Sequence, residues 1–218
     1  MTRSRDSNRA DRRLVVWGSG GHGRVVFDVA AAMNCFESLA FYDDAGEPGR
    51  VVSGVEVITG GVERLRGLGF KELVVAIGLN EVRARCHSEA NAAGLEMATC
   101  IHPTAWVSPF ATIGAGTVVM PRVVVQSGAS VGVDCILNTG VIVEHDCLIG
   151  DHAHLSPGVV LGGDVSVGMF AHVGTGAIAI PGARIGARAT IGAGAVVRGS
   201  IPPSVTAVGV PARILGKR

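Results

Sequence analysis

An aliphatic residue recurs at every sixth position from Ile101 to Val197, and this period constrains the fold more than any other feature of the chain. A six-residue period is neither helical nor the two-residue alternation of a plain strand. It is typical of a parallel β-helix, in which short strands stack coil on coil. The positions that share this period, called anchors below, are Ile101, Val107, Ile113, Val119, Val125, Val131, Leu137, Val143, Ile149, Leu155, Leu161, Val167, Val173, Ala179, Ile185, Ile191 and Val197.

Two further positions of the repeat support this interpretation. A small or slim residue follows each anchor by four places, as from Ala105 to Ala195, and we expect it to point inward. Glycine often follows the anchor directly, as in Ile113-Gly114, and we interpret it as tolerating the corner geometry. The chain has 48% hydrophobic and only 4% aromatic residues, which suits a narrow interior filled by small branched side chains. Burying one anchor contributes roughly 1.5–3 kcal/mol, so the series supplies a domain core.

Charge and composition limit the remaining classes. A formal net charge of +1 gives no electrostatic argument for binding nucleic acid or an acidic membrane surface. The run of apolar residues needed to span a bilayer is missing from the sequence, and residues 1–13 are polar and basic, unlike a signal peptide. We therefore expect a disordered tail over 1–13 and a cytoplasmic protein. The five cysteines form no CxxC pair, which favours reduced thiols.

Residues 14–100 are predicted to form a small Rossmann-like α/β domain, and residues 101–218 the β-helix. Apolar runs at 14–17, 39–42 and 73–77 predict parallel strands, with helices up to Met33, over 62–68 and over 80–93, and a possible short strand at 54–57. Ligands of such sheets bind beyond the carboxyl ends of the strands. Those ends carry the Gly18–Gly23 turn, Asp43-Asp44 and the Gly78–Glu81 loop, so a binding site is expected there.

The glycine turn, Gly18-Ser19-Gly20-Gly21-His22-Gly23, has more than one interpretation. The spacing Gly18-x-Gly20-x-x-Gly23, with acidic residues about twenty positions later, fits a dinucleotide site. The domain is too short for both halves of a dinucleotide fold, however, and a nucleotide-sugar diphosphate at the helix N-terminus is favoured. A purely structural turn remains open, as does a solvated helix-start role for His22. Asp43 and Asp44 are candidate acceptors for ribose or base groups.

The segment 138–158 holds three of the seven histidines. In the predicted register Val143 and Cys147 point inward, so His145 points outward between Glu144 and Asp146. A carboxylate near an imidazole raises its proton affinity, which suits a general base. An ordinary surface histidine remains the alternative.

The histidines of the repeat allow two other interpretations. His154 and His172 differ by three hexads and are expected to stack on adjacent coils as a surface ridge. A zinc site shared between neighbouring chains, as in β-helical carbonic anhydrases, would need three nitrogen donors at about 2.0–2.1 Å.

These motifs, in this order, resemble the left-handed β-helix acyltransferases that acetylate nucleotide-linked 4-amino sugars of the bacillosamine and perosamine type. Sialic acid O-acetyltransferases are related. The similarity runs from about residue 14 to the C-terminus and includes Gly18–Gly23, Asp43-Asp44, Ile77-Gly78 and the segment 138–151. It implies a homotrimer with the active site between adjacent solenoids, and acetyl-CoA as co-substrate without a metal.

The resemblance also implies roles for individual residues. It implies that His145 is the catalytic base and that Asp146, where many relatives carry Glu, raises its basicity. It implies contacts with the coenzyme at His154, Gly163, Thr175 and Ala193. It implies contacts with the nucleotide sugar at Gly20, Gly21, His22, Asp43, Asp44, Gly78 and Glu81.

The predicted function is acetyl transfer from acetyl-CoA to the 4-amino group of a GDP- or UDP-linked dideoxy amino sugar, by direct attack of the amine. O-acetylation of a sialic acid, a zinc-dependent lyase and a non-catalytic nucleotide-sugar sensor are the alternatives.

Overall fold

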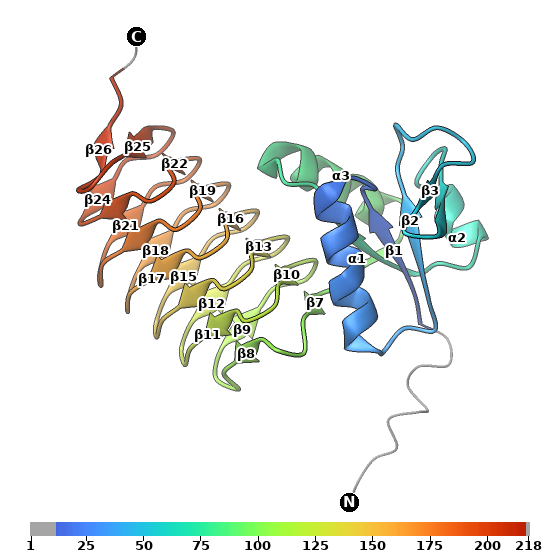
Figure 1. Cartoon of the computed structure of the whole chain (residues 1–218), viewed down its shortest axis with the longest axis horizontal. Coiled ribbons are helices and arrows are strands. Elements are labelled where there is room, and N and C mark those ends of the chain that lie inside the picture. The colour runs from blue at the N-terminus through green and yellow to red at the C-terminus, as the bar shows by residue number, and fades with distance from the viewer. Residues whose placement is uncertain (1–11, 217–218) are drawn as a thin grey trace, which may run out of the picture. The chain divides into compact units, whose positions relative to one another are not determined.

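The computed structural model describes residues 12–216, and the chain divides into two compact units, Met1–Pro103 and Thr104–Arg218. Figure 1 shows the elements of both units along the chain. The predicted tail lies outside the described residues except for Arg12 and Arg13, which is the first residue of strand β1. Over residues 12–216, no helix has the length and apolar character needed to cross a membrane.

The first unit is a Rossmann-like α/β domain, as predicted, with strand order β3-β4-β2-β1-β5-β6 in its sheet. All neighbouring strands run parallel except β3, which is antiparallel to β4. The elements are β1 (Arg13–Trp17), α1 (Gly21–Met33), β2 (Ser38–Tyr42), β3 (Val51–Val52), β4 (Val55–Ile58), α2 (Arg64–Gly67), β5 (Glu72–Val75), α3 (Asn80–Ala92), β6 (Glu96–Met97) and β7 (Cys100–Ile101).

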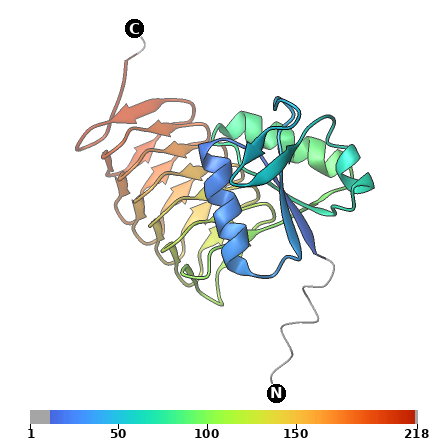
Figure 2. The same cartoon turned by 45° about the vertical axis from the view of Figure 1, so that its right-hand side comes forward.

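Helices cover both faces of this sheet because its central strands are apolar on both sides. Val15 and Trp17 of β1 belong to a buried cluster with residues of α2 and α3, such as Leu65 and Cys86. On the other side, Phe27 of α1 stacks on Phe41 of β2 with 4.4 Å between ring centroids. Figure 2 shows α1 and the strands behind it. Near-continuous apolar runs such as 14–17 are typical of strands buried on both faces.

The element boundaries differ from the sequence prediction in two places. The helix expected over 62–68 is limited to α2, because the chain forms a short turn at Gly69 with φ of 87°. The strand expected to reach Ile77 ends at Val75, and Ala76 and Ile77 lead into the loop before α3. The short strand β6 was not assigned from the sequence, whereas Ile101 of β7 is the first of the predicted anchors.

The second unit is a left-handed parallel β-helix, as predicted, with three sheets that we call I, II and III in the order in which each coil visits them. Sheet I contains β10 (Val118–Val119), β13 (Ile136–Leu137), β16 (His154–Leu155), β19 (His172–Val173), β22 (Thr190–Ile191), β25 (Thr206–Val208) and the antiparallel β26 (Arg213–Ile214). Sheet II contains β8 (Trp106–Val107), β11 (Val124–Val125), β14 (Ile142–Val143), β17 (Val160–Leu161), β20 (Ile178–Ala179) and β23 (Val196–Val197). Sheet III contains β9 (Thr112–Ile113), β12 (Ser130–Val131), β15 (Leu148–Ile149), β18 (Ser166–Val167), β21 (Arg184–Ile185) and β24 (Ser200–Ile201).

The interior follows the hexad period. Every anchor from Val119 to Val197 is buried, and so is every residue four places after an anchor from Thr117 to Ala195. Each strand pairs in parallel with the strand one coil further on, as in Ile142 with Val160. Partners on adjacent coils are therefore eighteen residues apart, as His152 and Asp134 are, except in the last coil, where Arg184 pairs with Ser200 and Thr190 with Thr206. This regular stacking determines on which sheet or corner a side chain lies and whether it points inward or outward.

The corners between the sheets correct one expectation about glycine. Left-handed backbone occurs three places after the anchor, at residues such as Gly140 and Asp146, and not at the glycine that follows the anchor. Where glycine does follow the anchor, the reason is space: a Cβ on Gly150 would lie 2.5 Å from the backbone nitrogen of Met169, and one on Gly174 2.7 Å from that of Ala193. At these two positions adjacent coils approach too closely for a side chain.

Candidate active site

His145 and Asp146 form an exposed imidazole–carboxylate pair at the corner between sheets II and III. Val143 and Cys147, on either side of them in the sequence, are fully buried, so the pair projects from the outer wall. The side chains of His145 and Asp146 are 64% and 69% exposed. His145 Nδ1 lies 2.9 Å from Asp146 Oδ2, so the short aspartate side chain reaches the imidazole. The left-handed backbone of Asp146, with φ of 60°, accompanies this arrangement.

This pair raises the pKa of His145. The hydrogen bond with Asp146 is the main cause, and the negative charges of Asp146, Glu144 and Asp164 add to it. A carboxylate at Nδ1 favours the tautomer that carries its proton on Nδ1, so the lone pair of the neutral ring lies on Nε2. The arrangement can therefore accept a proton at Nε2 from a group outside the wall.

Gly163 lies next to His145, one coil further along the same corner. A Cβ on Gly163 would be 2.5 Å from both Cε1 and Nε2 of His145, so the imidazole covers the face of this glycine. Thr175 and Ala193 occupy a different corner, between sheets I and II, where both are exposed on consecutive coils. Their coils are joined by a hydrogen bond from Gly194 N to Thr175 O. Three of the four residues predicted to contact the coenzyme, Gly163, Thr175 and Ala193, thus lie on the two corners that border sheet II.

His154 lies on the outer side of sheet I and is less exposed than the predicted surface ridge requires. It pairs with His172 on β19, as expected, with 4.8 Å between ring centroids, but only 9% of it is exposed. Asn138 Nδ2 is 3.5 Å from its Nε2. The period of a repeat tells which side of the wall a residue occupies, but packing around His154 on that side buries the ring.

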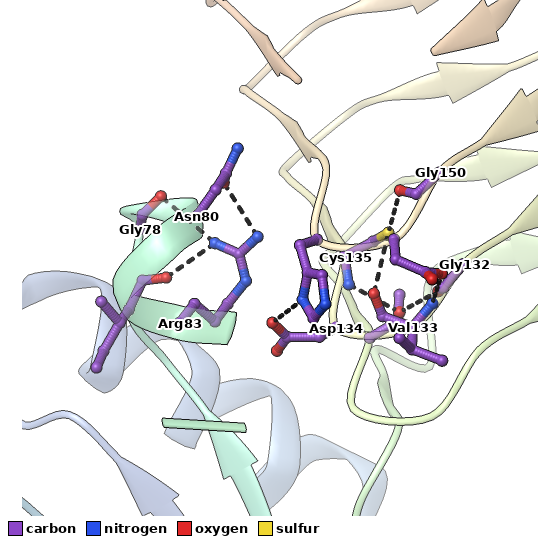
Figure 3. Close-up of polar contacts among 12 residues, drawn as sticks. Gly78, Asn80, Arg83, Gly132, Val133, Asp134, Cys135 and Gly150 are labelled. Atoms are coloured by element: carbon purple, nitrogen blue, oxygen red, sulfur yellow. Dashed lines mark hydrogen bonds and ion pairs between the residues drawn. The ribbon is translucent and has the colours of Figure 1, made fainter. Parts of the chain in front are cut away.

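Cys147 does not join the exposed pair. Its thiol points inward and donates to the carbonyl of Gly162 at 3.1 Å, and burial raises its pKa. Cys135 holds the same position of the hexad two hexads earlier, with its sulfur 3.2 Å from the carbonyl of Gly150 (Figure 3). Both thiols act as small core residues, as the sequence indicated.

In the α/β unit, the glycines of the turn after β1 separate into two kinds. Gly18 has φ of 119°, and a Cβ on Gly23 would overlap with the carbonyl of Gly18, so both are required by the fold. Gly20 and Gly21 begin α1, and a Cβ on either would meet no described atom within 4 Å. The space beside the first N–H groups of the helix is therefore open, and an anion bound there would be stabilised.

Asp43 and Asp44 are held by residues of β1 and the turn that follows it. Asp43 Oδ2 accepts hydrogen bonds from the backbone N–H of Ser19 at 3.1 Å and from its hydroxyl. Asp44 Oδ1 accepts one from Trp17 Nε1 at 3.1 Å. The two carboxylates thus lie beside the turn, as predicted, and Asp43 also fixes its shape. The sequence suggested only ligand acceptors and did not identify these partners.

His22 is not the solvated helix-start residue that the sequence left possible. Burial lowers the pKa of its imidazole to about 4, and the positive charge of Arg83 contributes. The side chain is therefore neutral at physiological pH.

Gly78 and Glu81 lie around the start of α3, where Gly78 precedes the helix and Glu81 is in its first turn. The buried guanidinium of Arg83 donates to Ile77 O at 3.1 Å, Gly78 O at 3.4 Å and Asn80 Oδ1 at 3.0 Å (Figure 3). Arg83 thus determines the course of this loop. Glu81 also suits the positive end of the helix dipole, which is a structural role independent of any ligand.

Two arginines of this unit were missed from the sequence. A groove of about 470 Å³ is lined by Ser19, Gly20, Gly21, Arg24, Arg50 and residues 51–53. Arg24 lies in the first turn of α1, where a positive charge is unfavourable for the helix dipole. That unfavourable position was the available signal. With two guanidinium groups, the groove suits a ligand with negative charge.

A zinc centre would need converging His, Cys, Asp or Glu ligands. Among residues 12–216 of a single chain, no group of three or more such residues could hold a metal ion. The zinc hypothesis also involved donors from neighbouring chains.

Comparison with known proteins adds to this geometry. Residues 13–90 match the PglD N-terminal domain family. The chain is 42% identical over 113 residues to UDP-N-acetylbacillosamine N-acetyltransferase of Bacillus subtilis (strain 168). That match covers 50% of this chain and 51% of the other protein, so it spans about half the length of this curated relative.

Two solved structures resemble nearly the whole chain. The acetyltransferase domain of PglB from Neisseria gonorrhoeae FA1090, in complex with acetyl coenzyme A, is 39% identical with a TM-score of 0.88, and the match covers 94% of this chain and 100% of that one. A mutant of perosamine N-acetyltransferase from Caulobacter crescentus, in complex with CoA and GDP-perosamine, is 40% identical with a TM-score of 0.89, covering 94% and 97%.

These likenesses, together with the fold and the exposed pair, define the class of left-handed β-helix acyltransferases. Within that class, the chain belongs to the family of nucleotide-4-amino-sugar N-acetyltransferases of the bacillosamine and perosamine type.

Proposed function

We propose that this protein transfers an acetyl group from acetyl-CoA to the 4-amino group of a nucleotide-linked dideoxy amino sugar. The observation that carries the proposal is the exposed pair, with His145 Nδ1 held 2.9 Å from Asp146 Oδ2. Relatives that share the whole architecture were solved with acetyl-CoA, or with CoA and GDP-perosamine.

In the proposed reaction the neutral amine attacks the thioester carbonyl directly. The C–N bond forms while Nε2 of His145 takes a proton from the nitrogen. The C–S bond then breaks, the imidazolium returns that proton to the leaving sulfur, and CoA departs as its thiol. Asp146 stabilises the imidazolium that forms. A donor such as His154 would stabilise the developing oxyanion. An acyl-enzyme is not required, which agrees with the inward direction of Cys147.

The α/β unit would hold the nucleotide. We assign the diphosphate to the groove of Arg24 and Arg50, beside the open faces of Gly20 and Gly21. Asp44, His22, Gly78 and Glu81 are then candidate contacts for the base and sugar, and Asp43 supports the turn through Ser19.

We further propose a homotrimer, because one face of the β-helix is apolar along its whole length. The outward residues of sheet II are Trp106, Val124, Ile142, Val160, Ile178 and Val196, whereas those of sheet III are Thr112, Ser130, Leu148, Ser166, Arg184 and Ser200. Trp106 is 58% and Ile178 42% exposed. A contiguous exposed apolar surface of this kind marks an interface.

A ring of three copies would also complete the proposed site. In a closed ring each copy uses two different surfaces. The corner of His145 and the corner of Thr175 and Ala193 border sheet II on its two sides. A copy packed on sheet II could therefore bring the base of one chain to the coenzyme contacts of the next.

The cysteines support the proposed cytoplasmic location. Cys35, Cys86, Cys100, Cys135 and Cys147 are all free thiols, which suits a reducing compartment.

Thiol release from acetyl-CoA tests the activity. The protein is assayed with UDP- and GDP-linked 4-amino sugars, with the matching 4-hydroxy sugars and with sialic acid, and the products are identified by mass spectrometry. We expect turnover with amino acceptors only. Turnover with a hydroxyl acceptor but with none of the amines would overturn the proposal.

Light scattering tests the trimer. We expect three times the mass of one chain, and dissociation in the variant Ile178→Asp on sheet II. Ser166→Asp, on sheet III, is the matched control and should stay trimeric. A parent protein with the mass of a single chain would contradict the proposed interface.

A further inference from the structure

The exposed pair lies between two glycines of the neighbouring coils. Residues two and three places after successive sheet II anchors form two columns along the same corner. His145 shares its column with Gly163, and Asp146 shares its column with Gly128 on the coil before. Backbone hydrogen bonds join these coils, from Asp146 N to Ser127 O at 3.2 Å and from Asp164 N to His145 O at 2.9 Å.

Gly163 provides the surface on which the imidazole lies. A Cβ there would be 2.5 Å from Cε1 and Nε2 of His145, which is closer than a carbon–carbon or carbon–nitrogen contact permits, and 3.2 Å from Cδ2, so the ring would have to move. The backbone of Gly163 does not have positive φ, so an alanine could adopt it. Glycine is therefore required at this position by the ring of His145 and not by the conformation of the corner.

Gly128 has the same relation to the carboxylate. A Cβ on Gly128 would overlap with Oδ1 of Asp146, the oxygen that does not bond to the imidazole. The left-handed φ of 73° at Gly128 adds a separate backbone reason for glycine. A test must therefore separate the two effects.

We infer that Gly128 and Gly163 are positioning residues for the His145–Asp146 pair, because their missing side chains leave the space that the carboxylate and the imidazole occupy. The inference rests on the proposed role of His145 as the base. Neither glycine needs to touch the substrate for this role.

Two of the carboxylates that act on the ring of His145, those of Glu144 and Asp164, lie outside the pair. Asp164 is held by Arg184, with Asp164 Oδ2 3.0 Å from Arg184 Nη2. Gly128 adjoins neither of them in the sequence, so a change in the titration of His145 after its substitution reports a movement of the pair itself.

The corner offers a matched control for each glycine. Gly199, between β23 and β24, also lacks positive φ, and an added Cβ would meet no described atom within 4 Å. Gly182 is in the column of Gly128 with φ of 77°, and its Cβ position is equally open. Alanine at Gly182 thus introduces the same backbone strain as alanine at Gly128 without touching the pair.

The experiment compares Gly163→Ala with Gly199→Ala and Gly128→Ala with Gly182→Ala. Steady-state kinetics, thermal unfolding and NMR titration of the His145 ring, assigned with a His145→Asn variant, are measured for each. We expect Gly163→Ala to lower kcat about 10- to 100-fold with little change in KM, because a displacement of about 1 Å is enough for such a loss. We expect Gly128→Ala to lower the pKa of His145 relative to Gly182→Ala.

Two outcomes would overturn the inference: equal kcat in Gly163→Ala and Gly199→Ala, or equal His145 titration in Gly128→Ala and Gly182→Ala. Failure of the proposed function is a different result, namely full turnover in His145→Asn. In that case the NMR titration still tests whether Gly128 positions the pair.

Discussion

The β-helix contains two imidazole–carboxylate pairs of nearly equal length in opposite surroundings. His145 and Asp146 are 2.9 Å apart, with side chains 64% and 69% exposed. His152 Nδ1 is 2.8 Å from Asp134 Oδ2, with side chains 17% and 0% exposed. The first pair joins adjacent residues within one corner, and the second joins consecutive coils. The hydrogen bond is thus the same in both pairs, and only the His145–Asp146 pair is exposed to a group outside the wall.

The buried pair belongs to a stack along the corner between sheets III and I. The ring of His152 lies 4.7 Å from that of Phe170, and the guanidinium of Arg188 lies 4.3 Å from the centre of the Phe170 ring. A solvated ligand has no access to Asp134, which is fully buried beneath this stack. In the described chain, the His145–Asp146 pair is covered neither by an aromatic ring nor by a guanidinium group.

The largest difference between the pairs should appear in catalysis. We expect His145→Asn to lower kcat by about 10² to 10⁴, the usual contribution of a general base, with little change in thermal stability. The measurement is thiol release under saturating substrates, alongside thermal unfolding. If His145→Asn unfolds at a lower temperature than the parent, or keeps the parent's turnover, the expected difference between the two pairs is contradicted.

The opposite pattern is expected for the buried pair. His152→Ala leaves the carboxylate of Asp134 buried without its imidazole partner, which costs about 3–5 kcal/mol of folding free energy. Urea unfolding measures this loss, and kcat of the folded enzyme should stay near that of the parent. Unfolding at the parent's urea concentration would show that the pair does not stabilise the β-helix.

His22 extends the comparison to an imidazole that is buried and neutral. Its folded pKa of about 4 is below the ordinary 6.5, so between these values the unfolded chain binds a proton that the folded chain does not. Stability should therefore fall as pH falls through this window, by up to about 3 kcal/mol from this residue. Urea unfolding at several pH values should show a weaker decline in His22→Asn. Parallel curves for parent and variant would contradict the assignment.

The smallest effect is expected for the carboxylate of the exposed pair. Asp146→Asn removes the main cause of the raised pKa of His145. Because the base acts when neutral, the acidic limb of kcat/KM should move to lower pH, and kcat should fall by up to about tenfold. Glu144→Gln is the control and should move the limb less, since Glu144 makes no hydrogen bond to the ring among the contacts of the described chain. An unmoved limb in Asp146→Asn would show that the hydrogen bond does not tune His145.

The sequence predicted the β-helix and the exposed pair because both follow from a local period. Once the anchors are known, Val143 and Cys147 must point inward and His145 outward. The reach of Asp146 to the ring could not be predicted, since it depends on the left-handed backbone of the corner. The role of glycine after the anchor was misinterpreted because the close approach involves a coil eighteen residues away.

The α/β unit was less predictable at the level of side chains, because its contacts are not periodic. The hydrogen bond from Ser19 to Asp43 joins residues twenty-four positions apart, and no sequence motif links the two positions. The groove of Arg24 and Arg50 joins the start of α1 to the residues before β3, which are distant in sequence. The strands and the glycine turn of this unit were predicted from the sequence, but the side-chain contacts around them were not.

The eighteen-residue coil also limits how such a chain can change its length. Inserting or deleting one whole coil elsewhere in the repeat would preserve the order of faces and leave the corner of His145 and Asp146 intact. A six-residue insertion between Asp146 and Gly162 would instead rotate every later residue onto the next face, so that Gly163 would no longer lie against His145. Length variation in the repeat is therefore expected in steps of a full turn, whereas the loops of the α/β unit can change by single residues.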